Sequence, residues 1–154
     1  MLSLTSEYAL RAIAELAREG SNGGATLARD LAERSDVPVH YLSKILTTLR
    51  RAGLLTATRG AKGGYLLARD PADIPLVEVV TLFDGDRVHP QCLFGKGREC
   101  TDDDPCDAHD AWKKVKQTYT TFLENQTIAS ISGLNSSSNH RERQNGRTAK
   151  NEDP

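Results

Sequence analysis

Long apolar stretches are absent from this 154-residue chain, and cysteines and aromatic residues are scarce. No hydrophobic run approaches the roughly 18 residues that a membrane span needs, so we expect no membrane-spanning helix. The N-terminal segment lacks a basic start and an unbroken apolar core, which argues against a signal peptide and favours the cytoplasm. Three cysteines are too few, and odd in number, for a disulfide framework. In a cytoplasmic protein they favour metal or redox chemistry.

The chain also has little net charge, only −1, since 20 Lys and Arg nearly balance 21 Asp and Glu. This balance hides an uneven distribution along the chain. Residues 38–69 carry six basic side chains and no acidic one, whereas residues 70–110 carry three basic and eleven acidic side chains. Such a basic stretch is typical of a surface that binds a polyanion such as DNA, although a solvated face would carry the same charge.

Hydrophobic spacing predicts helices over residues 4–18, 26–34 and 38–52. We expect Thr26 to cap the second helix, with Leu27 and Leu31 facing inward. The third helix has a polar, basic face opposite an apolar one that comprises Val39, Leu42, Leu46 and Leu49. Two β-prone runs around a glycine-rich turn then predict a hairpin within residues 54–68. Three helices followed by a hairpin is the order of a winged helix-turn-helix.

Two further helices are predicted, at residues 75–84 and 108–126. The long second one carries an apolar seam of Ala108, Trp112, Val115, Tyr119 and Phe122. A homodimer would cover this seam and suit palindromic DNA, and packing on its own domain is the alternative. We therefore expect a mainly α protein, a winged helix-turn-helix with a two-stranded β wing and a long C-terminal dimerisation helix.

The predicted organisation has four segments. A DNA-binding domain at residues 1–84 is followed by a cysteine-bearing loop at residues 85–107. The dimerisation helix and a short following segment occupy residues 108–133. The polar remainder, residues 134–154, has almost no hydrophobic side chain and is predicted to be disordered.

The third predicted helix and the wing supply the candidate DNA contacts. A recognition helix lies in the major groove with its N-terminal half nearest the bases. The candidates on it are His40, Tyr41, Ser43, Lys44 and Thr47 for bases or phosphates, and Arg50 and Arg51 for phosphates. In the wing, Arg59 and Lys62 lie among glycines, including Gly63, that let the backbone approach DNA. A nucleotide-binding loop fits poorly, because this loop joins two strands and does not open a helix.

The three cysteines and a histidine form a compact constellation. Cys92, Cys100, Cys106 and His109 fall within 18 residues of a loop rich in Gly and Asp. Three thiolates with a fourth ligand can hold zinc or an iron–sulfur cluster. The gaps of seven and five residues between the cysteines lack the close pairs typical of structural zinc, so they favour a cluster.

Together these motifs resemble the Rrf2 family of bacterial winged-helix regulators. The resemblance rests on residues 4–17, 37–55 and 58–80 and on three cysteines before a Trp-bearing helix, and it extends over residues 1 to about 133. It implies a homodimer that joins through the long helix and binds palindromic operators in double-stranded DNA. It also implies that the protein senses through an iron–sulfur cluster.

The resemblance implies that the three cysteines ligate the cluster. His109 matches the histidine of some cluster-binding members, which favours 2Fe–2S over 4Fe–4S. Glu7 lies in the first helix, where other relatives supply a carboxylate, sometimes from the partner subunit. The gap of seven residues between Cys92 and Cys100, however, resembles that of a different branch of the family from the one whose members carry the histidine. The fourth ligand therefore stays open among His109, Glu7 and water or a small ligand.

We expect a sequence-specific DNA-binding transcription regulator that responds to iron–sulfur status, nitric oxide or redox state. An enzyme is not expected, because no residues combine a nucleophile, a base and an orienting group. The alternatives are a DNA-binding regulator with structural zinc, a metal-free thiol redox switch, and a protein-interaction module that uses the long helix.

Overall fold

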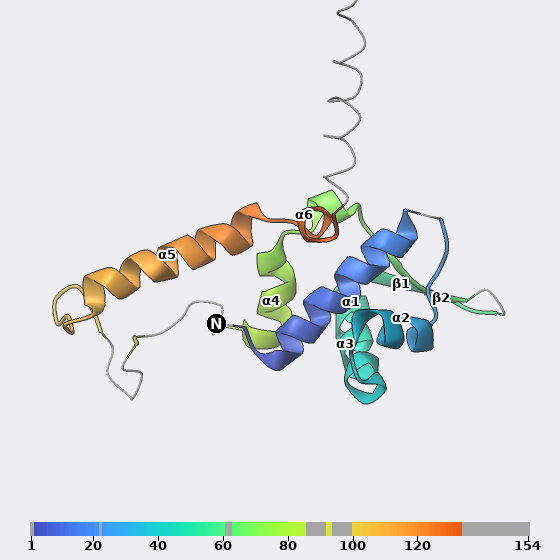
Figure 1. Cartoon of the computed structure of the whole chain (residues 1–154), viewed down its shortest axis with the longest axis horizontal. Coiled ribbons are helices and arrows are strands. Elements are labelled where there is room, and N and C mark those ends of the chain that lie inside the picture. Colours follow the sequence, from blue (N-terminus) through green and yellow to red (C-terminus); the bar gives the residue numbers. More distant parts are fainter. Residues whose placement is uncertain (1, 22, 61–62, 86–91, 94–99, 134–154) are drawn as a thin grey trace, which may run out of the picture.

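Helices dominate the architecture (Figure 1). The computed structural model describes residues 2–21, 23–60, 63–85, 92–93 and 100–133. The elements in chain order are α1 (Leu4–Gly20), α2 (Ala28–Ser35), α3 (Val39–Arg51), β1 (Leu55–Thr58), β2 (Gly64–Leu67), η1 (Pro71–Asp73), α4 (Leu76–Asp84), α5 (His109–Asn125) and α6 (Ile128–Ile131). This order confirms the mainly α prediction with a two-stranded sheet. The predicted polar tail lies outside the described residues.

α1 forms the centre of the core. Its side chains at Ala9, Ala12, Ile13 and Leu16 are fully or almost fully buried, and it contacts α2, α3, α4 and α6. Ser3 caps its first turn, because the Ser3 hydroxyl accepts a hydrogen bond from the backbone N–H of Ser6 at 3.2 Å. Over the described part of the chain, no helix is long and apolar enough to cross a membrane.

The start of α2 differs from the prediction. Leu27, and not Thr26, is the N-cap residue, and Leu27 is 48% exposed. Thr26 instead pairs with Tyr65 of β2 through two backbone hydrogen bonds of 3.0 and 2.8 Å. The prediction for both residues is wrong because this tertiary pairing extends the backbone ahead of α2, whereas Leu31 is buried as expected.

α3 buries the face that its periodicity predicts, with one exception. Leu42, Leu46 and Leu49 are buried, and Ile45 joins them. Val39 is 62% exposed, so its predicted burial is wrong. It lies in the first turn of α3, beyond the part of the helix that packs on the core.

The wing is an antiparallel hairpin in which Leu55 pairs with Leu67 and Thr58 pairs with Gly64. Gly64 has a φ of 154°, and a Cβ at this position would lie 2.5 Å from the carbonyl oxygen of Thr26. Glycine is therefore required where the base of the wing crosses the segment before α2.

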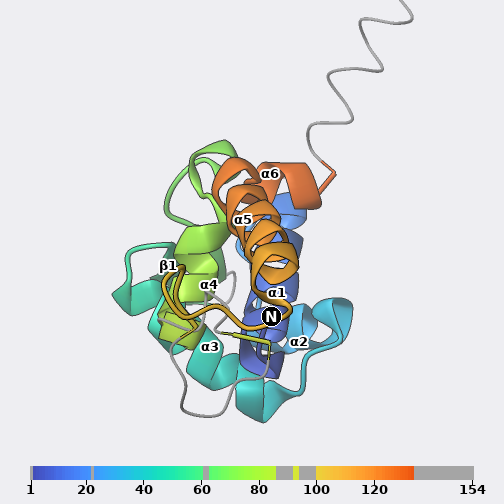
Figure 2. The same cartoon turned by 90° about the vertical axis from the view of Figure 1, so that its left-hand side faces the viewer.

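α5 extends away from the other helices and is attached at its C-terminal end (Figures 1 and 2). Leu123 is the buried residue of α5. Backbone hydrogen bonds of 2.9 Å from Leu76 to Gln126 and from Ile128 to Ile74 fix this end. The predicted seam is covered by its own domain only in part, since Tyr119 packs against the core whereas Val115 and Phe122 are each 50% exposed.

Candidate metal centre and nucleic-acid interface

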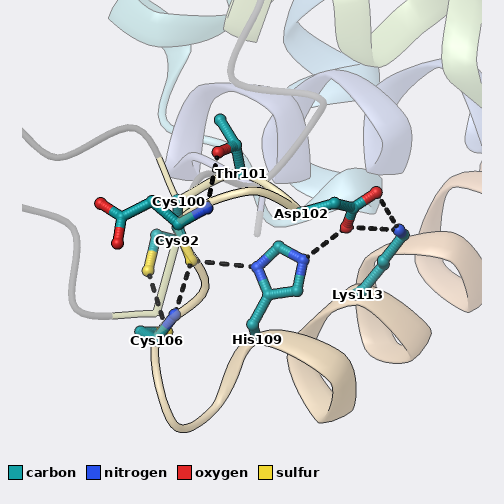
Figure 3. Close-up of polar contacts among 8 residues, drawn as sticks. Cys92, Cys100, Thr101, Asp102, Cys106, His109 and Lys113 are labelled. Atoms are coloured by element: carbon teal, nitrogen blue, oxygen red, sulfur yellow. Dashed lines mark hydrogen bonds and ion pairs between the residues drawn. The ribbon is translucent and has the colours of Figure 1, made fainter.

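The three cysteines meet beside the N-terminal end of α5 (Figure 3). Their Sγ atoms lie within 4.8 Å of one another, and Cys92 Sγ is 3.7 Å from Cys106 Sγ. Two thiolates on one tetrahedral metal, with metal–sulfur bonds of about 2.3 Å, lie about 3.8 Å apart. The sulfur atoms are therefore spaced as metal ligands are.

His109 begins α5 and faces the cysteines. Its Nδ1 lies 3.0 Å from Cys100 Sγ, and its backbone N–H donates to the carbonyl oxygen of Cys106 at 2.9 Å. The positive end of the α5 dipole favours thiolates and any anionic group that they hold. Three sulfur atoms and one imidazole nitrogen form a donor set that suits both zinc and iron–sulfur centres.

The surroundings of Cys100 favour its thiolate. The backbone N–H of Cys106 donates to Cys100 Sγ at 3.3 Å, and this bond, followed by the contact with His109, lowers the pKa of Cys100 to about 7. Burial, followed by the contact with Cys100, raises the pKa of Cys106. Because metals bind thiolates, and Cys100 loses its proton more readily than Cys106 at neutral pH, Cys100 is the more favourable metal ligand of the two.

Asp102 and Lys113 extend the contacts of His109 outward. His109 Nε2 lies 2.7 Å from Asp102 Oδ1, and Lys113 Nζ lies 2.7 Å from both oxygens of the same carboxylate. Asp102, and then Cys100, raises the pKa of His109, while Lys113, and then His109, lowers the pKa of Asp102. These contacts were not predicted from the sequence, in which the only signal for them is the position of Lys113 one helical turn after His109.

Glu7 is not part of this centre within one chain. It is exposed in the first turn of α1. Within the described ranges, the ligand atoms that lie within 4.8 Å of one another are those of the three cysteines alone. A ligand role for Glu7 stays a prediction that requires a second chain.

α3 presents its predicted DNA contacts on an exposed surface. The seven residues are all exposed; they are His40, Tyr41, Ser43, Lys44, Thr47, Arg50 and Arg51. The opposite face of the helix is buried in the core. The geometry therefore leaves a polar and basic helix surface open to a nucleic acid, and the individual contacts stay predictions.

An aromatic stack joins α1 to the first turn of α3. The ring centroid of Tyr41 lies 4.5 Å from that of His40 and 5.6 Å from that of Tyr8 in α1. The guanidinium of Arg11 lies 5.8 Å from the Tyr8 centroid. Such contacts fix the first turn of α3 against α1. The role of Tyr8 could not be predicted from the sequence, because its contact with α3 arises only in the packed structure.

In the wing, Arg59 is exposed directly after β1. Gly63 is buried, and a Cβ there would lie 2.6 Å from the carbonyl oxygen of Thr58. The turn itself therefore requires glycine at this position, and contact of Gly63 with DNA stays a prediction. Lys62, the other predicted wing residue, lies outside the described residues.

The comparison with known families decides the classification. Residues 2–133 match the model of Rrf2, an iron-dependent transcriptional regulator. The chain belongs to the Rrf2 family. The match runs from α1 through α6, and it confirms that the protein is a transcription regulator of this family.

The relatives of this Rrf2 protein include IscR regulators. The HTH-type transcriptional regulator IscR of Klebsiella pneumoniae (strain 342) is 34% identical over 132 residues, which cover 84% of this chain and 79% of that protein. Among solved structures, CymR, the global cysteine regulator of B. subtilis, has a TM-score of 0.71 at 25% identity and covers 87% of this chain and 97% of its own. T. potens IscR has a TM-score of 0.66 at 25% identity, and the match covers 98% of this chain and 93% of that protein. These likenesses confirm the predicted fold class, and with the three close cysteines they are consistent with an iron–sulfur cluster.

Proposed function

We propose that this Rrf2 protein is a homodimer that binds a palindromic operator in the cytoplasm, with an affinity that depends on an iron–sulfur cluster. Cys92, Cys100, Cys106 and His109 would hold the cluster. The observation that carries the proposal is the group of three cysteine sulfur atoms beside the N-terminal end of α5, with the Nδ1 of His109 in contact with one of them, that of Cys100.

A histidine beside the cysteines supports a 2Fe–2S cluster over 4Fe–4S. The three sulfur atoms lie within 4.8 Å of one another, and His109 Nδ1 lies 3.0 Å from Cys100 Sγ. A two-iron cluster takes two protein ligands on each iron, and histidine can replace cysteine. When bound, the cluster supplies a centre that oxidants, nitric oxide or a shortage of iron can alter.

The exposed face of α3 supports binding to double-stranded DNA. It lies within the stretch that has six basic and no acidic side chains. Phosphate contacts by such a surface give an affinity that falls steeply with salt. The helix followed by a hairpin wing suits insertion of α3 into the major groove.

The exposed apolar side chains of α5 support the homodimer. Val115 and Phe122 are half exposed on a helix that extends away from its own domain. The same helix of a second chain would cover them by a two-fold interface. Two-fold symmetry also matches the symmetry of a palindromic operator.

A metal-free thiol switch is the second candidate. Two observations favour it, the pKa of about 7 at Cys100 and the 3.7 Å distance between the sulfur atoms of Cys92 and Cys106. Structural zinc is a further use of the same donor set.

Anaerobic purification followed by iron, sulfide and zinc analysis tests the proposal. We expect a brown protein with near-stoichiometric iron and sulfide. Its affinity for DNA selected from a random pool should change roughly 5–150-fold when the cluster is removed, which corresponds to a coupling of about 1–3 kcal/mol. Cys100→Ser should lose the cluster, whereas Arg59→Ala, the reciprocal control, should keep it and bind DNA more weakly.

Other outcomes would contradict the cluster. Tightly bound zinc without iron would favour the structural site. A colourless, metal-free protein whose oxidant response disappears in the cysteine variants would favour the thiol switch.

A further inference from the structure

A line of polar contacts runs from the candidate metal centre to the surface of α5 (Figure 3). Cys100 Sγ lies 3.0 Å from His109 Nδ1, and His109 Nε2 lies 2.7 Å from Asp102 Oδ1. Lys113 Nζ then lies 2.7 Å from both carboxylate oxygens of Asp102. The ring of His109 is thus held on both edges, by a sulfur atom on one side and by a carboxylate on the other.

The carboxylate decides which ring nitrogen is available to a metal. An ionised Asp102 can only accept hydrogen bonds, so the nitrogen that faces it, Nε2, is the one that carries the proton. In the neutral ring the lone pair then belongs to Nδ1. That nitrogen is the one that faces Cys100.

We propose that Asp102 is a positioning residue that presents His109 to the cluster through Nδ1. This inference rests on the proposed function. Carboxylates that accept from the far nitrogen of a ligating histidine orient the ring and strengthen metal binding in many metal sites. In this chain one residue of the acidic run after Cys100 supplies that carboxylate.

Lys113 fixes the carboxylate in turn. It follows His109 by one helical turn, so both side chains leave the same face of α5. The side chains of Asp102 and Lys113 are 69% and 55% exposed, whereas that of His109 is only 10% exposed. Because an exposed ion pair adds little to stability, the effect of the Asp102–Lys113 contact falls on the orientation of His109 and not on the fold.

The neighbouring Asp103 provides a matched control. It is exposed like Asp102, carries the same charge and lies next to it in the loop. Within the described residues, the polar contacts of the His109 ring are with Cys100 and Asp102 and not with Asp103. Replacing either residue by alanine changes the net charge of the loop equally, so only a specific contact distinguishes the two variants.

The test compares wild type, Asp102→Ala, Asp103→Ala and His109→Ala after anaerobic reconstitution with iron and sulfide. Each protein is prepared with histidine labelled with ¹⁵N at Nδ1 only or at Nε2 only. Pulsed electron paramagnetic resonance of the reduced cluster then identifies the coordinated nitrogen. We expect a strong coupling to Nδ1 in wild type and in Asp103→Ala, and no strong nitrogen coupling in His109→Ala.

In Asp102→Ala the strong coupling to Nδ1 should be lost, and iron should be released about 10-fold faster or more. A change of this size is typical when a carboxylate that hydrogen-bonds a metal-ligating histidine is removed. If Asp102→Ala has the same nitrogen coupling and the same rate of iron release as wild type, the role of Asp102 is refuted and the proposed function stands. A loaded wild type without nitrogen coupling would also overturn it and leave the cluster intact. Failure of the wild type to bind iron and sulfide would refute the proposed function, and the inference with it.

Discussion

The exposed apolar face of α5 allows the dimer to be tested with one double variant, Val115→Ser with Phe122→Ser. Each side chain is 50% exposed in the single chain. Full burial of a valine or phenylalanine side chain stabilises by about 1.5–3 kcal/mol, so covering the exposed half of each contributes about 1 kcal/mol. In a two-fold dimer both chains contribute Val115 and Phe122, so four side chains are covered. The total of about 4 kcal/mol corresponds to roughly a thousand-fold in the dimer dissociation constant.

Sedimentation velocity over a range of protein concentrations measures this constant. We expect a wild-type dimer, and a double variant that dissociates at concentrations roughly a thousand-fold higher. Circular dichroism should show unchanged helix content, because neither side chain belongs to the buried core. Gln117→Ser, an exposed position on the opposite side of α5, should keep the wild-type constant. An unchanged constant in the double variant refutes the role of this face, and a wild type that stays monomeric refutes the dimer.

The wing and the buried carboxylate of Asp84 give two further predictions. Arg59→Ala should weaken DNA binding and lower the slope of log affinity against log salt by about 0.9, measured by fluorescence anisotropy. A slope equal to wild type would remove Arg59 from the phosphate contacts. Burial alone would raise the pKa of Asp84, but hydrogen bonds from Ser3 and Ser6 lower it overall. A lowered pKa stabilises the fold above the ordinary carboxyl pKa of about 3.9, and this contribution is lost as the pH falls through the folded-state pKa. Asp84→Asn should therefore cost about 1 kcal/mol at neutral pH, and the cost should shrink in acid, measured by urea unfolding. Parallel pH profiles for the two proteins would contradict this.

The helices were predictable because their buried residues recur at helical spacing. Leu42, Leu46 and Leu49 follow this rule and are buried. Val39 has the right spacing but lies in the first turn, where spacing cannot report how far the neighbouring elements extend. Thr26 has the chemistry of a cap, yet its backbone pairs with β2, which local sequence does not reveal. The error at Thr26 arises because a long-range contact outweighs a local preference, and the error at Val39 arises because spacing does not show where the neighbouring elements end.

The candidate metal centre was predictable in part because its residues lie close together in the sequence. Thiols separated by a few residues of loop can meet without the rest of the fold, and His109 follows Cys106 closely enough to join them. The role of Asp102 was hidden, because a run of aspartates in a polar loop is typical of a solvated surface. Only the return of this loop toward α5 brings Asp102 to His109 and Lys113.

The position of Asp84 suggests how the cysteine-bearing segment and the recognition helix affect each other. Asp84 ends α4, at the start of the segment that leads to Cys92, and it accepts a hydrogen bond of 3.1 Å from the backbone N–H of Ser3. A carboxylate is unfavourable at the C-terminal end of α4 but favourable at the N-terminal end of α1, which Ser3 caps. In the second turn of α1, Tyr8 contacts Tyr41 of α3.

Direct contacts therefore connect the end of α4 to the first turn of α3 through the first two turns of α1. A charged hydrogen bond contributes about 1.5–3 kcal/mol, which is comparable to the coupling that a 5–150-fold change in DNA affinity requires. If this route carries the coupling, Asp84→Asn should reduce the difference in DNA affinity between the cluster-loaded and cluster-free protein, with iron content unchanged. A full difference in that variant would exclude this route.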